Sequence, residues 1–404
     1  MPVPARSAAV LPETCALPED PARRRCLRAA LAAGAGLSTG LGFAVAHAAD
    51  PGVLPDQVRI GQTLTLQGGR NAYGVAVTQG IGLMFNEVNR GGGVHGRRLV
   101  LQTLDDENRN ATAEANARQL AQGGAFVLFA PIEGGPSGAV AKVAQELQVP
   151  LFGPMAGPPT LRRPHQSMVY PVRAEHREEF RALLAWGRGI GLRRVGFFHV
   201  DSDGGRAHLA NVQAIANELG MEVTLPLAFA PEIDDAALAA MGRRVADSRV
   251  EMVLNHGSVG LYRKLIVAAR EAGSRATLMG VNSGSSQLVA ALGPLAQGML
   301  FSQVVPSPWE RKHAISREYQ DAAKAADPRA EFSYGALEGY MTAKALVLAL
   351  RACGRDLSRA ALHRALRGHQ FDLGGLKIHY AEGDHAGAHF VDLSMVSRDG
   401  RFIH

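Results

Sequence analysis

Glycines, hydroxyl groups and amides gather in the short segments that follow the apolar runs of this sequence, and their chemistry is hydrogen bonding to a small solute. In open α/β sheets, ligands bind beyond the carboxyl ends of the strands, so these segments contain the candidates for a site. The candidates of the first half are Tyr73, Gly134, Gly135, Ser137, Ala156 and Gly157. Those of the second half are Gly204, Ser258 and Asn282. Such residues favour reversible binding in one shared cleft.

The segment Gly134-Gly135-Pro136-Ser137 is predicted to open a helix over residues 136–147, with Pro136 where its missing N–H costs nothing. The unpaired amides and the positive end of the helix dipole would then favour a ligand carboxylate. An ordinary strand-to-helix turn is the alternative interpretation. Ser258 and Asn282 have an alternative role as helix N-caps, which is compatible with ligand contact.

Motifs of the common catalytic folds are missing. Gly257-Ser258-Val259-Gly260 lacks the first glycine of a Gly-x-Ser-x-Gly elbow, and there is no Walker loop or dinucleotide fingerprint with an acidic partner. Asp105-Asp106-Glu107 could act as paired carboxylates, but a solvated strand end is the favoured interpretation. We therefore expect no enzyme activity and no cofactor. Hydrolysis of an amide stays a third hypothesis because Ser137 and His256 are present.

Metal ions and nucleic acids are disfavoured as partners. His379, His385 and His389 surround a glycine-rich turn without a recognised metal-ligand spacing, so we expect surface histidines and no metal site. The formal net charge of +6 is modest, and its lysines and arginines form no basic and aromatic stripe.

The elements that must position the candidate residues alternate in a βαβ pattern. In the first half we predict strands at 58–64, 98–104, 125–129 and 150–152 and helices at 75–89, 112–122 and 136–147. The pattern then restarts with helices at 176–189, 205–219, 235–246 and 259–271 and strands at 194–198, 222–225, 251–254, 277–280 and 299–304. After Pro306-Ser307-Pro308 come helices at 309–326, 332–352 and 358–366 and strands at 376–380 and 391–397.

This order predicts an α/β fold of two Rossmann-like lobes with parallel central sheets, joined by a hinge that the chain crosses several times. The sequence has 404 residues and is 47% hydrophobic, which suits two domains of ordinary size. We assign 1–49 to a signal peptide, 50–172 and 306–384 to the first lobe, and 173–305 and 385–404 to the second. Closure of such a hinge over a ligand is expected.

The first fifty residues have the features of an export signal. Arg23-Arg24-Arg25 and Arg28 precede an apolar run over 29–46, which ends in the small residues Ala46-His47-Ala48. The arginines resemble a twin-arginine signal, a general secretory signal is the other route, and an uncleaved anchor is the alternative. After cleavage Cys353 would be the remaining cysteine of the chain, so no internal disulfide is expected. We expect a mature protein in the periplasm.

Several motifs together resemble the leucine/isoleucine/valine-binding family of type I periplasmic receptors. They are Val58-Arg59-Ile60-Gly61, Tyr73-Gly74, the run Phe85-Asn86-Glu87-Val88-Asn89-Arg90-Gly91-Gly92-Gly93-Val94-His95-Gly96-Arg97, Leu104-Asp105-Asp106, and Leu337-Glu338-Gly339-Tyr340. The resemblance implies a non-enzymatic, monomeric receptor that delivers a small molecule to the permease and ATPase subunits of an ABC importer. A sensor module of the same fold, which signals to a partner protein, is the alternative function.

The resemblance also indicates where this sequence departs from amino-acid receptors. Tyr73 keeps the family's aromatic residue, whereas the serine that holds the ligand carboxylate falls on Gly134 or Gly135. The second lobe's aromatic residues become Gly204 and Ser258, and its acidic residue becomes Asn282. A buried ammonium without a carboxylate partner is costly, which disfavours an α-amino acid.

The expected ligand is therefore a small organic acid, an aromatic carboxylate, an amide or an amino-acid-like molecule. Arg70 or Arg173 could add a bidentate carboxylate contact, with an exposed loop arginine as the default interpretation of each.

Overall fold

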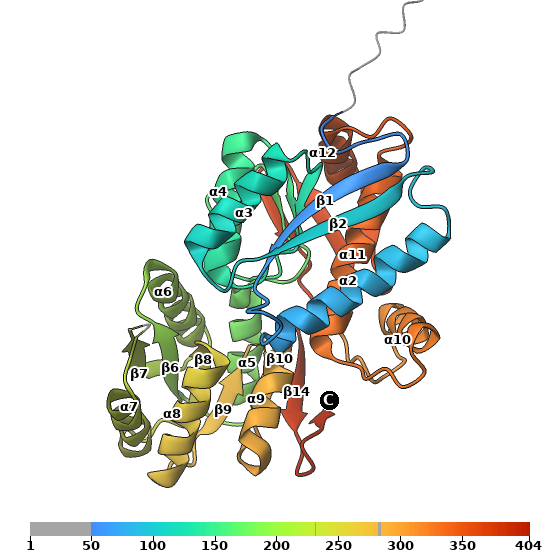
Figure 1. Ribbon diagram of the computed structural model, residues 1–404. Coiled ribbons are helices and arrows are strands. Elements are labelled where there is room, and N and C mark those ends of the chain that lie inside the picture. Colours follow the sequence, from blue (N-terminus) through green and yellow to red (C-terminus); the bar gives the residue numbers. More distant parts are fainter. Residues whose placement is uncertain (1–49, 231, 282–283) are drawn as a thin grey trace, which may run out of the picture. The chain divides into compact units, whose positions relative to one another are not determined.

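The computed structural model describes residues 50–230, 232–281 and 284–404 (Figure 1). Residues 50–404 belong to one compact unit. The sequence-predicted signal peptide therefore lies outside the described residues. Within residues 50–404 the described chain forms two α/β lobes, each with its own sheet, as the alternating pattern predicts.

The first lobe is built on a parallel sheet of five strands in the order β2-β1-β3-β4-β5. Every pair of neighbouring strands in it is parallel. Its strands are β1 (Gln57–Leu64), β2 (Arg98–Asp105), β3 (Val127–Phe129), β4 (Leu151–Phe152) and β5 (Val169–Tyr170). The connecting helices are α2 (Ala72–Arg90), α3 (Asn110–Gln122) and α4 (Gly134–Leu147), followed by a short 3-10 turn η1 (Pro159–Leu161).

The chain returns to the first lobe after building the second. The returning elements are α10 (Ala314–Ala326), α11 (Tyr334–Ala352), α12 (Arg359–Gly368), and the antiparallel strands β11 (Phe371–Asp372), β12 (Lys377–Ala381) and β13 (Asp384–Gly387). Helix α11 packs along α2 (Figure 1). Glycine is required at this contact, because a Cβ on Gly80 would lie 1.8 Å from the Ala336 carbonyl oxygen. The apolar face of α2 is therefore covered by a helix that follows it by some 250 residues in sequence.

The second lobe has a seven-stranded sheet in the order β15-β14-β10-β9-β8-β6-β7. Its parallel strands are β6 (Arg194–Val200), β7 (Glu222–Phe229), β8 (Met252–His256), β9 (Thr277–Gly280) and β10 (Leu300–Gln303). Its helices are α5 (His176–Gly189), α6 (Asp203–Glu218), α7 (Asp235–Asp247), α8 (Val259–Glu271) and α9 (Ser285–Leu292), with a 3-10 turn η2 (Gly293–Ala296). The strands β14 (Asp392–Val396) and β15 (Phe402–Ile403) are antiparallel, so this sheet is mixed where we predicted a parallel one.

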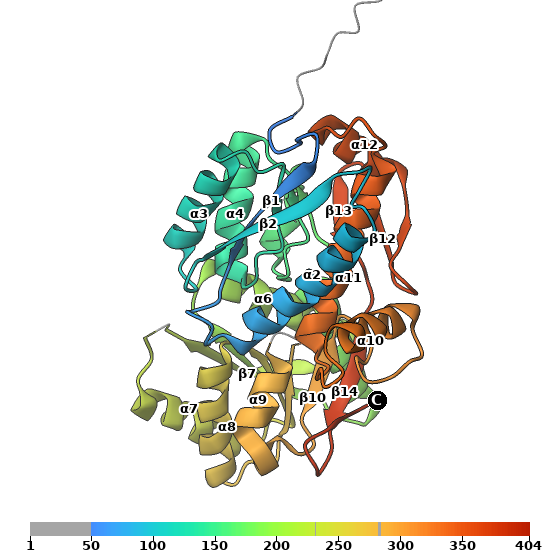
Figure 2. The same ribbon diagram turned by 45° about the vertical axis from the view of Figure 1, so that its right-hand side comes forward.

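The antiparallel pairing follows from the crossings between the lobes. The chain passes from β5 into α5, returns from β10 to α10, and passes over again from β13 to β14. Because β14 enters the second lobe on a separate crossing, it joins the sheet beside β10 from the opposite direction (Figure 2). Multiple crossings were expected for a hinge between lobes, and the described chain has them.

The predicted elements agree closely with the structure, with instructive exceptions. Helices α5 and α8 and strand β9 have the predicted bounds, whereas β5 and α9 were not predicted. The helix predicted from Trp309 begins at Ala314. The segment before it is instead tied to the side of α10, because Gln320 Nε2 donates to the carbonyl oxygens of Pro308 and Glu310.

Candidate ligand-binding site

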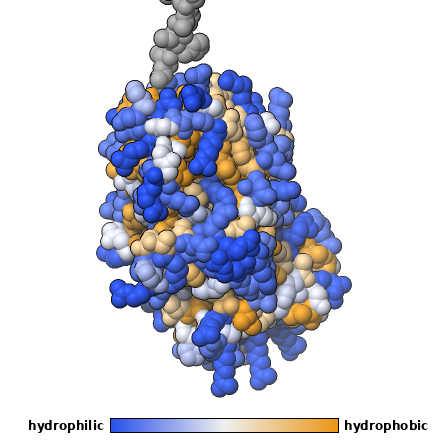
Figure 3. Space-filling view, turned by 90° about the vertical axis from the view of Figure 1, so that its right-hand side faces the viewer, coloured by the Kyte–Doolittle hydropathy of each residue, from blue (hydrophilic) through white to orange (hydrophobic). Residues whose placement is uncertain are grey.

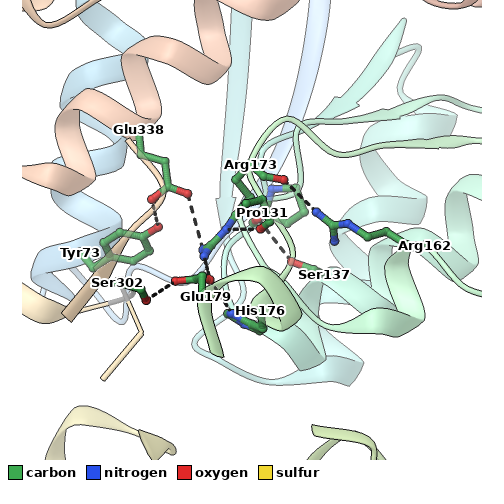
Figure 4. Close-up of polar contacts among 10 residues, drawn as sticks. Tyr73, Pro131, Ser137, Arg162, Arg173, His176, Glu179, Ser302 and Glu338 are labelled. Atoms are coloured by element: carbon green, nitrogen blue, oxygen red, sulfur yellow. Dashed lines mark hydrogen bonds and ion pairs between the residues drawn. The ribbon is translucent and has the colours of Figure 1, made fainter. Parts of the chain in front are cut away.

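Tyr73, the second residue of α2, is buried and points its hydroxyl toward the hinge. The Tyr73 Oη donates to Glu338 Oε2 on α11 at 2.9 Å (Figure 4). Its backbone N–H donates at 3.1 Å to the side-chain oxygen of Gln287, on α9 of the second lobe. In this orientation the Gln287 side-chain nitrogen donates to the Gly284 carbonyl oxygen. Tyr73 therefore lies where the first lobe meets the second.

Helix α4 begins at Gly134, two residues before the predicted start, so Pro136 occupies its third position and still lies in the first turn. Gly134 and Gly135 are exposed, whereas Ser137 is buried and donates to the Pro131 carbonyl oxygen at 3.3 Å. The N-cap residue is Glu133, at φ 65° and ψ 144°. The predicted helix start is thus present, and a carboxylate precedes it.

The loop after β4 packs against the second lobe at Gly157. The His176 backbone N–H, at the start of α5, donates to the Gly157 carbonyl oxygen at 2.9 Å. A Cβ on Gly157 would lie 2.7 Å from atoms of His176, so glycine permits this close approach. Ala156 beside it is 3% exposed.

The candidates of the second lobe lie at helix starts. Gly204 is half-buried in the first turn of α6, and Ser258 is the exposed N-cap of α8, where its hydroxyl accepts from the Leu261 N–H at 3.4 Å. The capping role weighed for Ser258 is therefore confirmed. Asn282 lies outside the described residues. Its ligand contact and its alternative capping role therefore stay predictions.

Arg173 is the centre of a buried charge network at the first crossing between the lobes (Figure 4). Its guanidinium forms an ion pair with Glu179 on α5 and lies 3.6 Å from Glu338 Oε1 on α11. Glu179 also accepts from Ser302 Oγ on β10 at 2.8 Å and faces His176 Nδ1 at 2.8 Å. Side chains of both lobes thus meet on one cation.

The expectation of an exposed Arg173 is wrong, because its side chain is 1% exposed and its charge is matched by glutamates. Arg70 is exposed, which agrees with its interpretation as an exposed loop arginine. Asp106, expected at a solvated strand end, is instead fully buried. The hydroxyls of Thr63 and Thr65 donate to its carboxylate and hold the end of β2 against that of β1.

Four histidines form a cluster at the carboxyl ends of the second lobe's strands. His199 and His256 are register partners on β6 and β8, His208 lies on α6, and His176 begins α5. The ring centroids of His208 and His256 are 3.9 Å apart, and those of His176 and His256 are 5.0 Å apart. Within the described residues, no hydrogen bond reaches His199 Nε2, His208 Nδ1 or His256 Nδ1, although all three atoms are buried.

Burial favours the neutral imidazole at His176, His208 and His256. It lowers the pKa of His256 to about 3, with the charge of nearby His176 as a second cause. It also lowers the pKa of His208 far below the usual range, and that of His176 less strongly. No group of His, Cys, Asp or Glu side chains that could hold a metal ion occurs in the part of the chain that the structure describes.

The comparisons with known proteins now fit this architecture. The family model of the periplasmic binding proteins matches residues 57–401, which include both lobes. This chain belongs to that family. The family and the similar structures are substrate-binding proteins rather than enzymes. None of the described helices is long and apolar enough to cross a membrane.

Solved structures share the fold over most of the chain. An extracellular ligand-binding receptor from Verminephrobacter eiseniae is 25% identical, with a TM-score of 0.77, covering 86% of this chain and 100% of that one. A possible leucine/isoleucine/valine-binding protein from Rhodopirellula baltica is 24% identical, with a TM-score of 0.78 and coverage of 86% and 96%. An ABC transporter solute-binding protein from R. palustris, in complex with benzoate, is 20% identical, with a TM-score of 0.73 and coverage of 86% and 95%. The search of curated proteins found no match.

The charge network of this binding protein is electrostatically satisfied. Burial opposes the charge of Glu179, but the adjacent Arg173 outweighs it and lowers the pKa of that carboxyl to about 2. Burial likewise opposes the charge of Arg173, and the carboxylates of Glu179 and Glu338 raise its pKa above the ordinary value. Burial, and next the charge of Glu338, raise the pKa of Tyr73 well above its ordinary value, so its hydroxyl stays a donor. Arg173 and Glu179 therefore stay charged at neutral pH.

Sequence reasoning missed the glutamates and most of the histidine cluster. The spacing of His176 and Glu179, one helical turn apart, signals a shared face of α5, but their partners come from distant segments. The expectation of surface histidines near the end of the chain is wrong for His385. That ring stacks on Tyr170 at 4.3 Å, with its Nδ1 2.8 Å from the Val169 carbonyl oxygen.

A surface groove lies elsewhere, on the first lobe. It has a volume of about 570 Å³, lies between α2, α10 and α11, and is lined in part by Glu87, Glu318, Tyr340 and Lys344. Figure 3 shows the face on the side of α10 and α11, where hydrophilic residues cover most of the surface with smaller apolar patches between them. This groove is open and is lined by elements of the first lobe alone, so we place the candidate site at the facing loops of the two lobes.

Proposed function

We propose that this protein is the extracytoplasmic receptor of an ABC importer, which binds one small solute between its lobes and presents it to the permease and ATPase subunits. The observation that carries the proposal is the family match over residues 57–401, together with the meeting of both lobes at Tyr73, Gly157 and Arg173. The similarity to an ABC transporter solute-binding protein from R. palustris supports it. Closure of the lobes would bury the ligand and create the shape that the permease recognises.

The proposed ligand is a small organic acid, an aromatic carboxylate, an amide or an amino-acid-like molecule. We propose that it contacts the loops that contain Tyr73, Gly134, Gly135, Ser137, Ala156, Gly157, Gly204, Ser258 and Asn282. Two observations support these places. Gly134 and Gly135 expose their backbone at the start of α4, and Tyr73 and Gly157 lie where the lobes meet.

We also propose that residues 1–49 are a signal peptide, read by the twin-arginine or the general secretory route, and that the mature protein is a periplasmic monomer. We propose lobe boundaries at 172/173 and 305/306, between β5 and α5 and between β10 and α10, whereas the boundary expected at 384/385 falls within β13, which pairs with β12 of the first lobe. The arginines and the apolar run of the leader support export. Mass spectrometry of protein from the periplasmic fraction would test this, and a mass that includes the leader would contradict cleavage.

A thermal-shift screen of residues 50–404 tests the function. The panel contains organic acids, aromatic acids, amides and amino acids, because a ligand at a hundred times its dissociation constant stabilises by about 2.7 kcal/mol. We expect one chemical class to raise the midpoint temperature of unfolding, and we expect the bound compound to be recovered unchanged. If no class stabilises the protein, or if the protein converts the compound, the receptor function is wrong.

A further inference from the structure

Glu133 occupies a backbone conformation that is nearly reserved for glycine. It lies between β3 and α4 with φ 65° and ψ 144°, where a side chain is strained. Glycines follow at positions 134 and 135, yet a glutamate stands at the strained position itself. Strain that persists in a loop at the end of a strand points to a function for the side chain.

Glu133 is half-buried, and among the described residues its side chain forms no hydrogen bond or ion pair. Burial, and next the charge of Asp106, raise the pKa of this carboxyl above its ordinary value. The charge of Glu133 also acts on Tyr73. The loop therefore holds an acceptor whose desolvation is not compensated by the chain itself.

Glu133 stands close to the place where the second lobe approaches. Ile132 pairs with Met155, and a Cβ on Gly134 would lie 3.7 Å from Pro158. Gly157, one residue before that proline, accepts the His176 backbone N–H of the second lobe. Contacts between neighbours thus link the residues that flank Glu133 to His176 of the histidine cluster.

The facing side of the second lobe offers neutral groups. His208 is 1% exposed and its Nδ1 has no hydrogen-bond partner among the described residues, and the same holds for the buried Nδ1 of His256. Neutral imidazoles can donate or accept, but they do not offset a carboxylate as a cation would. An additional ligand carboxylate placed beside Glu133 would therefore be repelled.

We infer that Glu133 binds the ligand and selects molecules that bring a hydrogen-bond donor, such as an ammonium, amide or hydroxyl group, to the first lobe. An ionised carboxylate only accepts hydrogen bonds, so its partner must donate. This inference rests on the proposed receptor function. It reverses the polarity expected for the start of α4, where the sequence favoured a ligand carboxylate.

The test compares matched ligands by isothermal titration calorimetry on residues 50–404. The probes are leucine and 4-methylpentanoate, which differ by the ammonium group, and benzamide and benzoate, which differ by the amide donor. We expect the donor-bearing member of a pair to bind more tightly. Glu133→Gln should weaken binding of the tighter ligand at least tenfold, whereas Glu107→Gln, at an exposed carboxylate of the preceding strand-to-helix loop, should leave its affinity unchanged.

Glu133→Gly separates a ligand contact from a structural role. Glycine relieves the strain, so the variant should keep or raise its melting temperature while losing the same affinity as Glu133→Gln. A wild type that binds a probe as tightly as Glu133→Gln does, or that prefers the donor-free member of each pair, overturns the inference and leaves the receptor function standing. Binding of no probe, with no small molecule released on denaturation, overturns both.

Discussion

Two buried polar regions lie next to each other at the hinge, and they solve the same problem in different ways. The Arg173 network keeps its charges, because Glu179 and Glu338 lie against the guanidinium. His208 and His256 of the histidine cluster are neutral, because burial lowers their pKa values. His176 belongs to both regions, since its Nδ1 faces Glu179 and its ring faces His256. The comparison shows that a titratable group is tolerated in the interior either when an opposite charge pairs with it or when it is neutral.

The largest expected effect comes from removing the shared cation. Arg173→Met should lower the free energy of unfolding by about 3–5 kcal/mol, because it leaves buried carboxylates without their counter-charge. Urea unfolding at neutral pH measures the loss. The control is Arg206→Met, which removes an exposed guanidinium paired with Asp201 and Asp203 and should lower the free energy of unfolding far less. Equal losses in the two variants would show that pairing does not stabilise the hinge.

The histidine cluster should make the protein sensitive to mild acid. The unfolded chain binds protons near the ordinary histidine pKa of 6.5, whereas folded His208 does not, so stability falls as the pH decreases from 7 to 5. Each such histidine accounts for roughly 2 kcal/mol over this interval. His208→Gln should remove about that share of the loss in unfolding free energy.

His379→Gln, at an exposed position, is the matched control and should leave the pH dependence unchanged. Unfolding curves recorded at pH 7, 6 and 5 supply the comparison. If His208→Gln lost stability with the same slope as the wild type, the neutral form of His208 would not be the cause.

A smaller effect is expected at the edge of the charge network. Tyr73→Phe removes the hydroxyl that donates to Glu338 and should cost about 1.5 kcal/mol, as for a hydrogen bond to a charged group. Because the ring stays in place, the loss should be smaller than for Arg173→Met. A loss as large as that of Arg173→Met would mean that the network depends on Tyr73 as much as on its cation.

Much of the fold could be predicted because its signals are local. The bounds of α5, α8 and β9 follow from hydrophobic period and flanking turn residues. The two-residue strand β5 has too few residues to show a period, and α9 follows a segment rich in glycine and serine, so neither was predicted. The antiparallel direction of β14 was not predicted either, because it depends on which crossing between the lobes brings that strand to the sheet.

The candidate site was predicted less completely. The capping role of Ser258 was anticipated and the start of α4 was predicted to within two residues, because caps and helix starts have local sequence signatures. Glu133, two residues before Gly135, carried no signal, since its importance comes from a backbone angle and from the absence of an ion pair to its carboxylate among the described residues. The solvated interpretation of Asp106 failed because its partners, Thr63 and Thr65, belong to another strand.

The sequence by itself determined the alternation of strands and helices, the two lobes and the family of this protein, because short-range periodicity and motif order are properties of neighbouring residues. The tertiary structure decided which charges are buried. Arg173, Glu179 and Glu338 come from segments up to 165 residues apart, and only folding places them within reach of each other. Burial then sets their protonation, because the cost of a charge depends on the water and the partners that the fold leaves around it.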